Sequence, residues 1–212
     1  MTRLATEEEI EALLKRYRIP HVNEVCAKDL PRLLNASRKL PTPWVLKIIS
    51  RDATHKTDKG LVKLNIHNEN ELKKAFATIQ KKAKGIRIEG YVIQEQKNGV
   101  EFIVGGKVDP VFGNVLVFGL GGLFVELIKE RSLRILPIDE KEVRTMLRET
   151  KASAFFTGYR NQWVSEDALA AFVMKAAHML YHEERIMELD FNPVIARERE
   201  ILVADARIVW ND

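Results

Sequence analysis

Two strand-like runs, residues 101–108 and 114–118, are joined by the turn sequence DPVFGN. A second turn sequence, ARERE, separates strand-like runs at residues 186–195 and 201–209. Strands joined this closely run antiparallel, because a parallel connection needs a crossover of a dozen or more residues. The sequence therefore predicts that at least part of the sheet is antiparallel.

Helical periodicity alternates with these strand signals. A first helix is predicted over residues 6–17, where Thr6 and Glu9 form a capping box ahead of an apolar stripe. Further helices are predicted from Asn68 to Gly85, from Asp139 to Leu147 and from Ser165 to Leu180, and further strands at residues 43–49, 61–66 and 90–96. This order predicts an α+β fold of two lobes, residues 1–92 and 93–212, with the seam near residues 85–99.

Composition excludes several classes of protein. The chain has 212 residues, of which 46% are hydrophobic and 30% charged, as in an ordinary soluble protein. Its basic and acidic residues are interspersed and leave a net charge of +4, which gives mild support for an anionic ligand. The sequence has no aromatic platform and no recognised motif for nucleic acid, so no nucleic-acid partner is expected. The apolar run at 110–125 contains an asparagine and four glycines, so no membrane span is expected.

The ends and the cysteine content point to a cytoplasmic location. The first residues, MTRLATEEEIEALLKRY, are acidic and amphipathic, unlike a signal peptide. Cys26 is the only cysteine, so no internal disulfide is possible. A reducing cytoplasm is the expected compartment.

Lys47 interrupts an apolar strand just before a polar loop that contains His55. A lysine on one face of a sheet, next to loop N–H groups, suits a polyphosphate. A lysine that extends from a solvated strand face would give the same pattern. Glu95 ends a strand beside the seam, where free backbone groups suit an adenine edge, and Glu101 begins the next strand, where its carboxylate suits ribose hydroxyls. Two ordinary surface carboxylates beside a turn are the alternative.

Acidic and amide side chains gather near the C-terminus. Asp190 and Asn192 alternate with apolar residues and so share one strand face, and Asp205 interrupts the following apolar strand. A hairpin would bring Asn192 opposite Asp205. Oxygen ligands on paired strands suit Mg²⁺ held together with a phosphate ligand, whereas a cross-strand hydrogen bond is the alternative.

Three segments together resemble a known family. PWVLKIISRDATHKTDKG, EFIVGGKVDPVFGNVLVFGLGGLFVEL and ELDFNPV with VADARI are similar to the ATP-grasp module of ADP-forming acyl-CoA synthetases, particularly the beta subunit of ADP-forming acetate–CoA ligase. The chain is also similar to the nucleotide-binding subunit of succinyl-CoA synthetase. The match runs from about residue 5 to residue 209. It implies a two-lobed ATP-grasp fold with nucleotide between the lobes.

The resemblance also implies roles for individual residues. Lys47 matches a lysine that contacts nucleotide phosphates, Glu95 falls beside adenine, and Glu101 matches a ribose-binding glutamate. Asn192 and Asp205 match magnesium ligands, with Asp190 at the neighbouring acidic position. His55 matches a histidine that accepts a phosphoryl group, and a neutral imidazole is a competent acceptor near pH 7.

The implied reaction converts acyl-CoA, ADP and phosphate into acid, CoA and ATP, with Mg²⁺ and ATP/ADP bound. It also implies a CoA-binding alpha subunit as partner in a hetero-oligomer, with a heterotetramer expected, because this chain has no CoA-binding segment. A non-catalytic ATP-binding regulatory subunit of an acyltransferase or CoA-ligase complex is the alternative. The chain departs from the family where Leu61 replaces a second loop glycine and where YRNQW follows Gly158.

Overall fold

The chain forms two units, each built around its own sheet, in a computed structural model that describes residues 2–50, 60–122 and 130–211. The larger unit comprises residues 1–21 and 98–212, and the smaller unit comprises residues 22–97. The chain therefore crosses between the units twice, once after His21 and once after Lys97. The second crossing lies within the predicted seam at residues 85–99.

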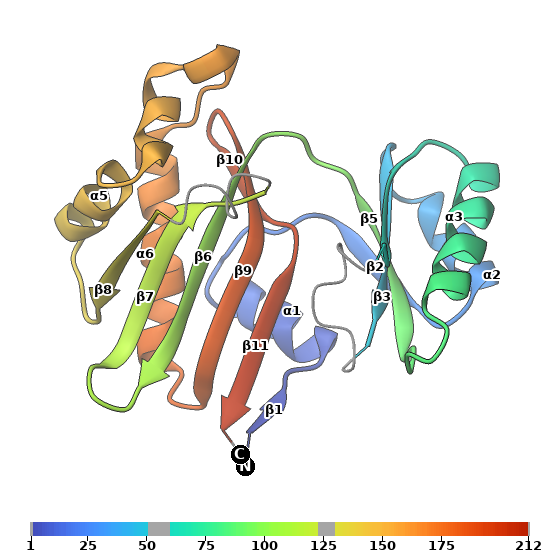
Figure 1. Ribbon diagram of the computed structural model, residues 1–212, viewed down its shortest axis with the longest axis horizontal. Coiled ribbons are helices and arrows are strands. Elements are labelled where there is room, and N and C mark those ends of the chain that lie inside the picture. Colours follow the sequence, from blue (N-terminus) through green and yellow to red (C-terminus); the bar gives the residue numbers. More distant parts are fainter. Residues whose placement is uncertain (1, 51–59, 123–129, 212) are drawn as a thin grey trace. The chain divides into compact units, whose positions relative to one another are not determined.

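The described part of the larger unit has a seven-stranded antiparallel sheet in the order β1-β11-β9-β6-β7-β8, with β10 paired to β9 (Figure 1). Its strands are β1 (Thr2–Leu4), β6 (Val100–Asp109), β7 (Gly113–Leu120), β8 (Arg131–Ile135), β9 (Ile186–Arg197), β10 (Glu200–Val203) and β11 (Ala206–Asn211). Both predicted turns are confirmed, since DPVFGN joins β6 to β7 and ARERE joins β9 to β10.

Helices α1 (Glu7–Arg16), α5 (Glu140–Arg148) and α6 (Glu166–His182) bury their apolar stripes in one core with this sheet. Figure 1 shows α6 behind β6 and β7. Phe102, Phe118 and Phe191 are fully buried beneath these helices. Two short 3₁₀ helices, Lys151–Thr157 and Tyr159–Asn161, follow α5.

The described part of the smaller unit has a four-stranded antiparallel sheet in the order β2-β5-β3-β4. Its elements are β2 (Glu24–Ala27), α2 (Leu30–Ser37), β3 (Trp44–Ile49), β4 (Val62–Ile66), α3 (Glu69–Lys82) and β5 (Gly90–Glu95). Helices α2 and α3 pack on the face that carries Leu46, Ile48 and Ile93, which are fully buried.

The N-terminal segment belongs to the larger unit, although the predicted boundary at residues 92 and 93 assigned it to the N-terminal lobe. Strand β1 pairs with β11, and Ile10, Leu13 and Leu14 of α1 are buried in the core of the larger unit. Long-range strand pairing therefore decides the location of residues 1–21. The predicted capping box is present: Glu9 N–H donates to Thr6 Oγ1, and Thr6 N–H donates to a Glu9 carboxylate oxygen.

The longest described helix, α6, has 17 residues. Among the described residues, no helix combines the length and apolar character of a membrane span. The predicted strand within the apolar run at 110–125 is confirmed as β7, which ends at Leu120 just before Gly121 and Gly122. The remainder of that run lies outside the described residues.

Candidate nucleotide and metal site

Lys47 lies near the middle of β3, on the face of the smaller sheet opposite α2 and α3. Its cross-strand neighbours are Val92 on β5 and Val62 on β4. The residue is only 8% exposed, and its ammonium lies 3.7 Å from a carboxylate oxygen of Glu24 on β2. A lysine that extended freely into solvent would not be this buried. The structure thus places a buried cation, paired with Glu24, on this face of the sheet.

Gln94 is a polar residue on the same face that the sequence analysis missed. It pairs across the sheet with Val45 on one side and Glu24 on the other. Its side-chain carbonyl is buried and has no hydrogen-bond partner among the described residues. A buried acceptor of this kind normally has a partner, so it suits a ligand that supplies a donor group. The signal was visible in the sequence, because Gln94 interrupts the apolar strand YVIQE as Lys47 interrupts β3.

Glu95 is buried at the end of β5, and both of its carboxylate oxygens have partners. One oxygen accepts hydrogen bonds from the backbone N–H of Asn23 (3.1 Å) and from its side-chain amide (2.9 Å). The other lies 3.6 Å from the Lys97 ammonium. Asn23 and Lys97 each lie within two residues of a crossing between the units. The carboxylate therefore joins the two connecting segments within the smaller unit.

His55 lies outside the described residues, as do Arg51, Lys56 and Lys59 of the same polar loop. Description of the chain resumes at Gly60, whose φ of +65° places it in the left-handed region that favours glycine. The single glycine retained in DKGLV thus stands where the backbone needs one.

Glu101 is the second residue of β6 in the larger unit, next to the glycine pair Gly121 and Gly122. The N–H of Gly121 donates to the carbonyl oxygen of Glu101 over 2.7 Å. A Cβ added at Gly122 would lie 2.6 Å from a carboxylate oxygen of Glu101. The glycines therefore allow close packing beside Glu101. Partial desolvation raises the pKa of the Glu101 carboxyl, although the residue as a whole is exposed.

Helices α1, α5 and α6 cover one face of the larger sheet, and the opposite face is called the front face. The front face carries Glu101, Ile103 and Gly105 of β6 and Asp190 and Asn192 of β9. Their positions follow from the strand alternation, because the intervening Phe102, Val104, Leu189 and Phe191 are buried in the core.

Asn192 and Asp205 lie opposite each other on the front face. The N–H of Asn192 donates to the carbonyl oxygen of Asp205 over 3.0 Å, which confirms the predicted pairing. The predicted single strand 201–209 is divided into β10 and β11, with Asp205 in the interval. The part of β9 opposite this interval includes Pro193, which has no N–H to donate to the strand ladder.

Asp190 adds a second carboxylate close to Asp205. Burial raises the pKa of Asp190, and the nearby Asp205 carboxylate raises it further, while the opposing Arg207 and Arg131 lower it. Two carboxylates and an amide oxygen on one face are the hard donors that Mg²⁺ prefers, and a cation there would relieve the repulsion. The described residues contain no cluster of three acidic, histidine or cysteine ligands, so phosphate oxygens and water would have to complete the shell.

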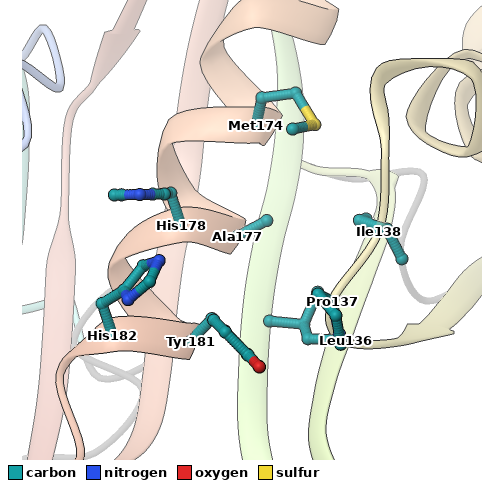
Figure 2. Close-up of a pocket in the computed structure, with 8 residues that line it drawn as sticks. All are labelled: Leu136, Pro137, Ile138, Met174, Ala177, His178, Tyr181 and His182. Carbon is teal, nitrogen blue, oxygen red and sulfur yellow. The ribbon is translucent and has the colours of Figure 1, made fainter.

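His178 and His182 line a separate pocket of about 140 Å³ between α6 and the segment after β8 (Figure 2). Their ring centroids are 4.1 Å apart, as the four-residue spacing on one helix face requires. Leu136, Pro137, Ile138, Met174, Ala177 and Tyr181 complete the lining. The pocket is mainly apolar and includes none of the predicted site residues.

The comparisons with known proteins identify the family. The model of the ATP-grasp domain matches residues 1–209. Over 209 residues the chain is 36% identical to the beta subunit of acetate–CoA ligase [ADP-forming] I from Pyrococcus furiosus, and the match covers 96% of this chain and 90% of that subunit. The chain belongs to the ATP-grasp family of ADP-forming acetate–CoA ligase beta subunits.

Some relatives of this ATP-grasp chain are longer. It is 35% identical over 208 residues to acetate–CoA ligase [ADP-forming] II from Archaeoglobus fulgidus. That match covers 97% of this chain but only 30% of the Archaeoglobus protein. The chain thus spans less than a third of that relative and nearly all of the Pyrococcus subunit.

Solved structures of acetyl-coenzyme A synthetase 1 from Ca. Korarchaeum cryptofilum have the same fold. One, in complex with coenzyme A, Ca-AMPCP and HgCl⁺, matches with a TM-score of 0.90 and 38% identity, over 99% of this chain and 93% of that chain. Another, with coenzyme A and Mg-AMPPCP, matches with a TM-score of 0.81 and 36% identity, over 98% and 93% of the two chains. The phosphohistidine segment of that protein points towards its nucleotide-binding site. The predicted ATP-grasp fold is confirmed.

Proposed function

We propose that this ATP-grasp chain is the nucleotide-binding beta subunit of an ADP-forming acyl-CoA synthetase, which transfers a phosphoryl group between a phosphohistidine and ADP with Mg²⁺. The observation that carries the proposal is the match over 90% of the length of the Pyrococcus beta subunit. A Korarchaeum relative that holds coenzyme A, Mg-AMPPCP and a phosphohistidine segment in one protein supports the same chemistry.

The residues of each unit have separate roles in this proposal. In the smaller unit, Lys47 binds nucleotide phosphates through a charge-assisted contact, and the unpartnered Gln94 carbonyl accepts a donor from the ligand. In the larger unit, Glu101 accepts hydrogen bonds from the ribose, and Asn192, Asp205 and Asp190 hold Mg²⁺. Magnesium neutralises phosphate charge when bound, and phosphoryl transfer depends mainly on such neutralisation and on positioning.

Glu95 positions the site through its neighbours. Its carboxylate already accepts from Asn23 and pairs with Lys97, so it fixes the backbone at the end of β5 beside the adenine. The side chain itself is committed to these contacts, which leaves the backbone groups of the connecting segment to meet the base.

His55 is the proposed phosphoryl carrier. In the direction of ATP synthesis, the bond between phosphorus and an imidazole nitrogen of His55 breaks, and a β-phosphate oxygen of ADP forms the new bond to phosphorus. The imidazole recovers its electron pair and is free to accept another phosphoryl group. That group comes from a phosphorylated histidine of a CoA-binding alpha subunit, which forms it from an acyl phosphate.

The proposal therefore includes an alpha partner, in a hetero-oligomer that we infer to be a heterotetramer in the cytoplasm. The relatives' designation as beta subunits supports a partner chain.

The test is reconstitution of this chain with the CoA-binding chain that co-purifies with it from native extract. His55→Ala is expected to bind Mg-ADP normally but to lose ATP synthesis by several orders of magnitude, because a covalent carrier is missing. His67→Ala, which changes an exposed histidine of the same unit, serves as the control and keeps full turnover. Near-normal turnover in His55→Ala would overturn the carrier assignment, and nucleotide binding without turnover in the parent complex would favour a regulatory subunit.

A further inference from the structure

Arg131 extends across the front face of the larger sheet from its edge strand, β8. It is exposed, and its cross-strand partner on β7 is Gly119. A Cβ added at Gly119 would lie 3.3 Å from Cγ of Arg131 and 3.0 Å from the Glu130 carbonyl oxygen. The aliphatic part of Arg131 therefore occupies the place where a β7 side chain would stand. Glycine at this position allows the arginine to reach from the edge toward the centre of the sheet.

A second glycine makes room for Asp190 from the opposite direction. Gly105 of β6 pairs directly with Asp190 of β9, and a Cβ added at Gly105 would lie 3.9 Å from a carboxylate oxygen of Asp190. Arg131 and Asp190 thus lie beside two glycines on one face of the sheet. The glycines are diagonal neighbours, because Gly119 pairs with Ile103 and Gly105 pairs with Val117.

The two charges do not meet in a salt bridge. Among the described residues, Arg131 has neither a hydrogen-bond partner nor an ion-pair partner within contact distance. Arg134, three residues along β8 and on the opposite face, bonds instead to Glu149 at 2.7 Å and to Ser132. Arg207, directly opposite Asp190, lies 3.7 Å from Glu188. No described neighbour therefore engages the Arg131 guanidinium, which can bind a ligand.

We propose that Arg131 binds a phosphate oxygen of the nucleotide held at the front face, across the two glycines from Asp190 and Asn192. The guanidinium keeps its charge at every physiological pH, and its planar N–H groups match phosphate oxygens in a bidentate geometry. A phosphate bound between Arg131 and the carboxylates would have a cation on one side and the candidate metal ligands on the other. This inference rests on the proposed function and adds a phosphate ligand that the sequence analysis did not identify.

The alternative is that Arg131 only balances the charge of Asp190. In that case its removal would change the stability of the protein without ligand and leave phosphate recognition intact. A phosphate ligand has the opposite signature, because the exposed guanidinium makes no contact that holds the fold together. The two roles are therefore separable by experiment.

The experiment measures Mg-ADP binding by calorimetry for the intact chain and for Arg131→Gln and Arg131→Lys. Arg131→Gln is expected to weaken binding roughly 10-fold or more, the effect of losing one charge-assisted hydrogen bond, and Arg131→Lys to recover part of the loss. The melting temperature without nucleotide should stay unchanged in both variants. Equal affinity for ADP in the parent and in Arg131→Gln, or a lowered melting temperature with unchanged affinity, would overturn the proposal.

Arg134→Gln is the matched control, because it removes the same charge from the other face of the same strand. It should lower the melting temperature through loss of the Glu149 contact and leave Mg-ADP affinity unchanged in the folded protein. Failure of the parent chain to bind Mg-ADP would defeat the proposed function itself. If the parent binds Mg-ADP and Arg131→Gln binds it equally well, only the assignment of Arg131 is wrong.

Discussion

Asn192 and Asp205 face each other across a gap in the strand ladder, joined by a backbone hydrogen bond of 3.0 Å from the Asn192 N–H to the Asp205 carbonyl oxygen. The backbone bond holds the two residues opposite each other without using their side chains. A metal role and a structural role for this pair therefore make different predictions, because the backbone bond survives replacement of either side chain.

We expect Asp205→Ala and Asn192→Ala to abolish the Mg²⁺ dependence of ADP affinity and to leave the melting temperature without nucleotide nearly unchanged. The reason is that both variants remove a hard oxygen donor and keep the backbone pairing. Calorimetry with and without Mg²⁺ provides the measurement, and Glu188→Gln on the same strand provides the control. Variants that simply unfold would assign the pair to structure.

Gly122→Ala should impair nucleotide binding more than Gly113→Ala. Both glycines have a positive φ, +66° and +72°, so each substitution carries a similar backbone strain of about 1–2 kcal/mol. Only at Gly122 would the new Cβ meet Glu101, at 2.6 Å from a carboxylate oxygen, whereas nothing lies within 4 Å at Gly113. Because the two variants carry a similar strain, a difference between their Kd values for ADP reports the effect on Glu101. The same Kd for both variants would contradict a ribose contact by Glu101.

Lys47→Ala should weaken Mg-ADP binding by about 1.5–3 kcal/mol through loss of a charge-assisted contact. Lys63→Ala on the neighbouring strand β4 is the control, because Lys63 pairs with Leu46 and so lies on the opposite face of the sheet. Titration calorimetry compares the two variants. Unaltered affinity in Lys47→Ala would remove Lys47 from the site.

Glu95→Ala should destabilise the smaller unit by roughly 1–3 kcal/mol, since it removes the charged acceptor of two hydrogen bonds from Asn23. Nucleotide affinity should then fall through loss of order in the connecting segments, and lowering the temperature should restore part of it. Denaturant unfolding followed by ADP titration distinguishes this from a direct contact. A loss of affinity at unchanged stability would show that the carboxylate itself meets the nucleotide.

Stability below pH 5 should depend on Glu9. Side-chain hydrogen bonds from Arg3, reinforced by the Thr6 N–H, lower the pKa of Glu9 from 4.5 to about 2. The ionised carboxylate thus stabilises the fold at neutral pH, and this contribution is lost as the pH falls from about 4.5 toward 2.

Glu9→Gln should consequently be less stable than the parent at pH 7, with a difference that shrinks across that acidic range. Because Glu9 is partly exposed, we expect a modest effect. Thermal melts at several pH values provide the measurement, with Glu8→Gln on the same helix as control. A difference that stays constant between pH 5 and pH 2.5 would contradict the role of Glu9.

Local sequence determined the elements whose signals are self-contained. The capping box at Thr6 and Glu9, the turns DPVFGN and ARERE, and the alternation in β9 each specify structure within a few residues, and each is present in the fold. Helix α2 was missed although Asp29 caps it and Pro31 lies in its first turn, because its eight residues carry only a short apolar stripe. The short strands β1 and β2 gain their pairing from partners distant in sequence.

Tertiary structure decided which of the polar residues are committed to other contacts. The sequence marked Lys47, Glu95, Asn192 and Asp205 as unusual by their apolar neighbours, and that reasoning needs only strand periodicity. It could not reveal that Glu95 is held by Asn23, that the Gln94 carbonyl is unpartnered among the described residues, or that two glycines bring Arg131 and Asp190 over the same face. Those facts depend on register between strands far apart in the chain, where a shift of one residue would move every side chain to the other face.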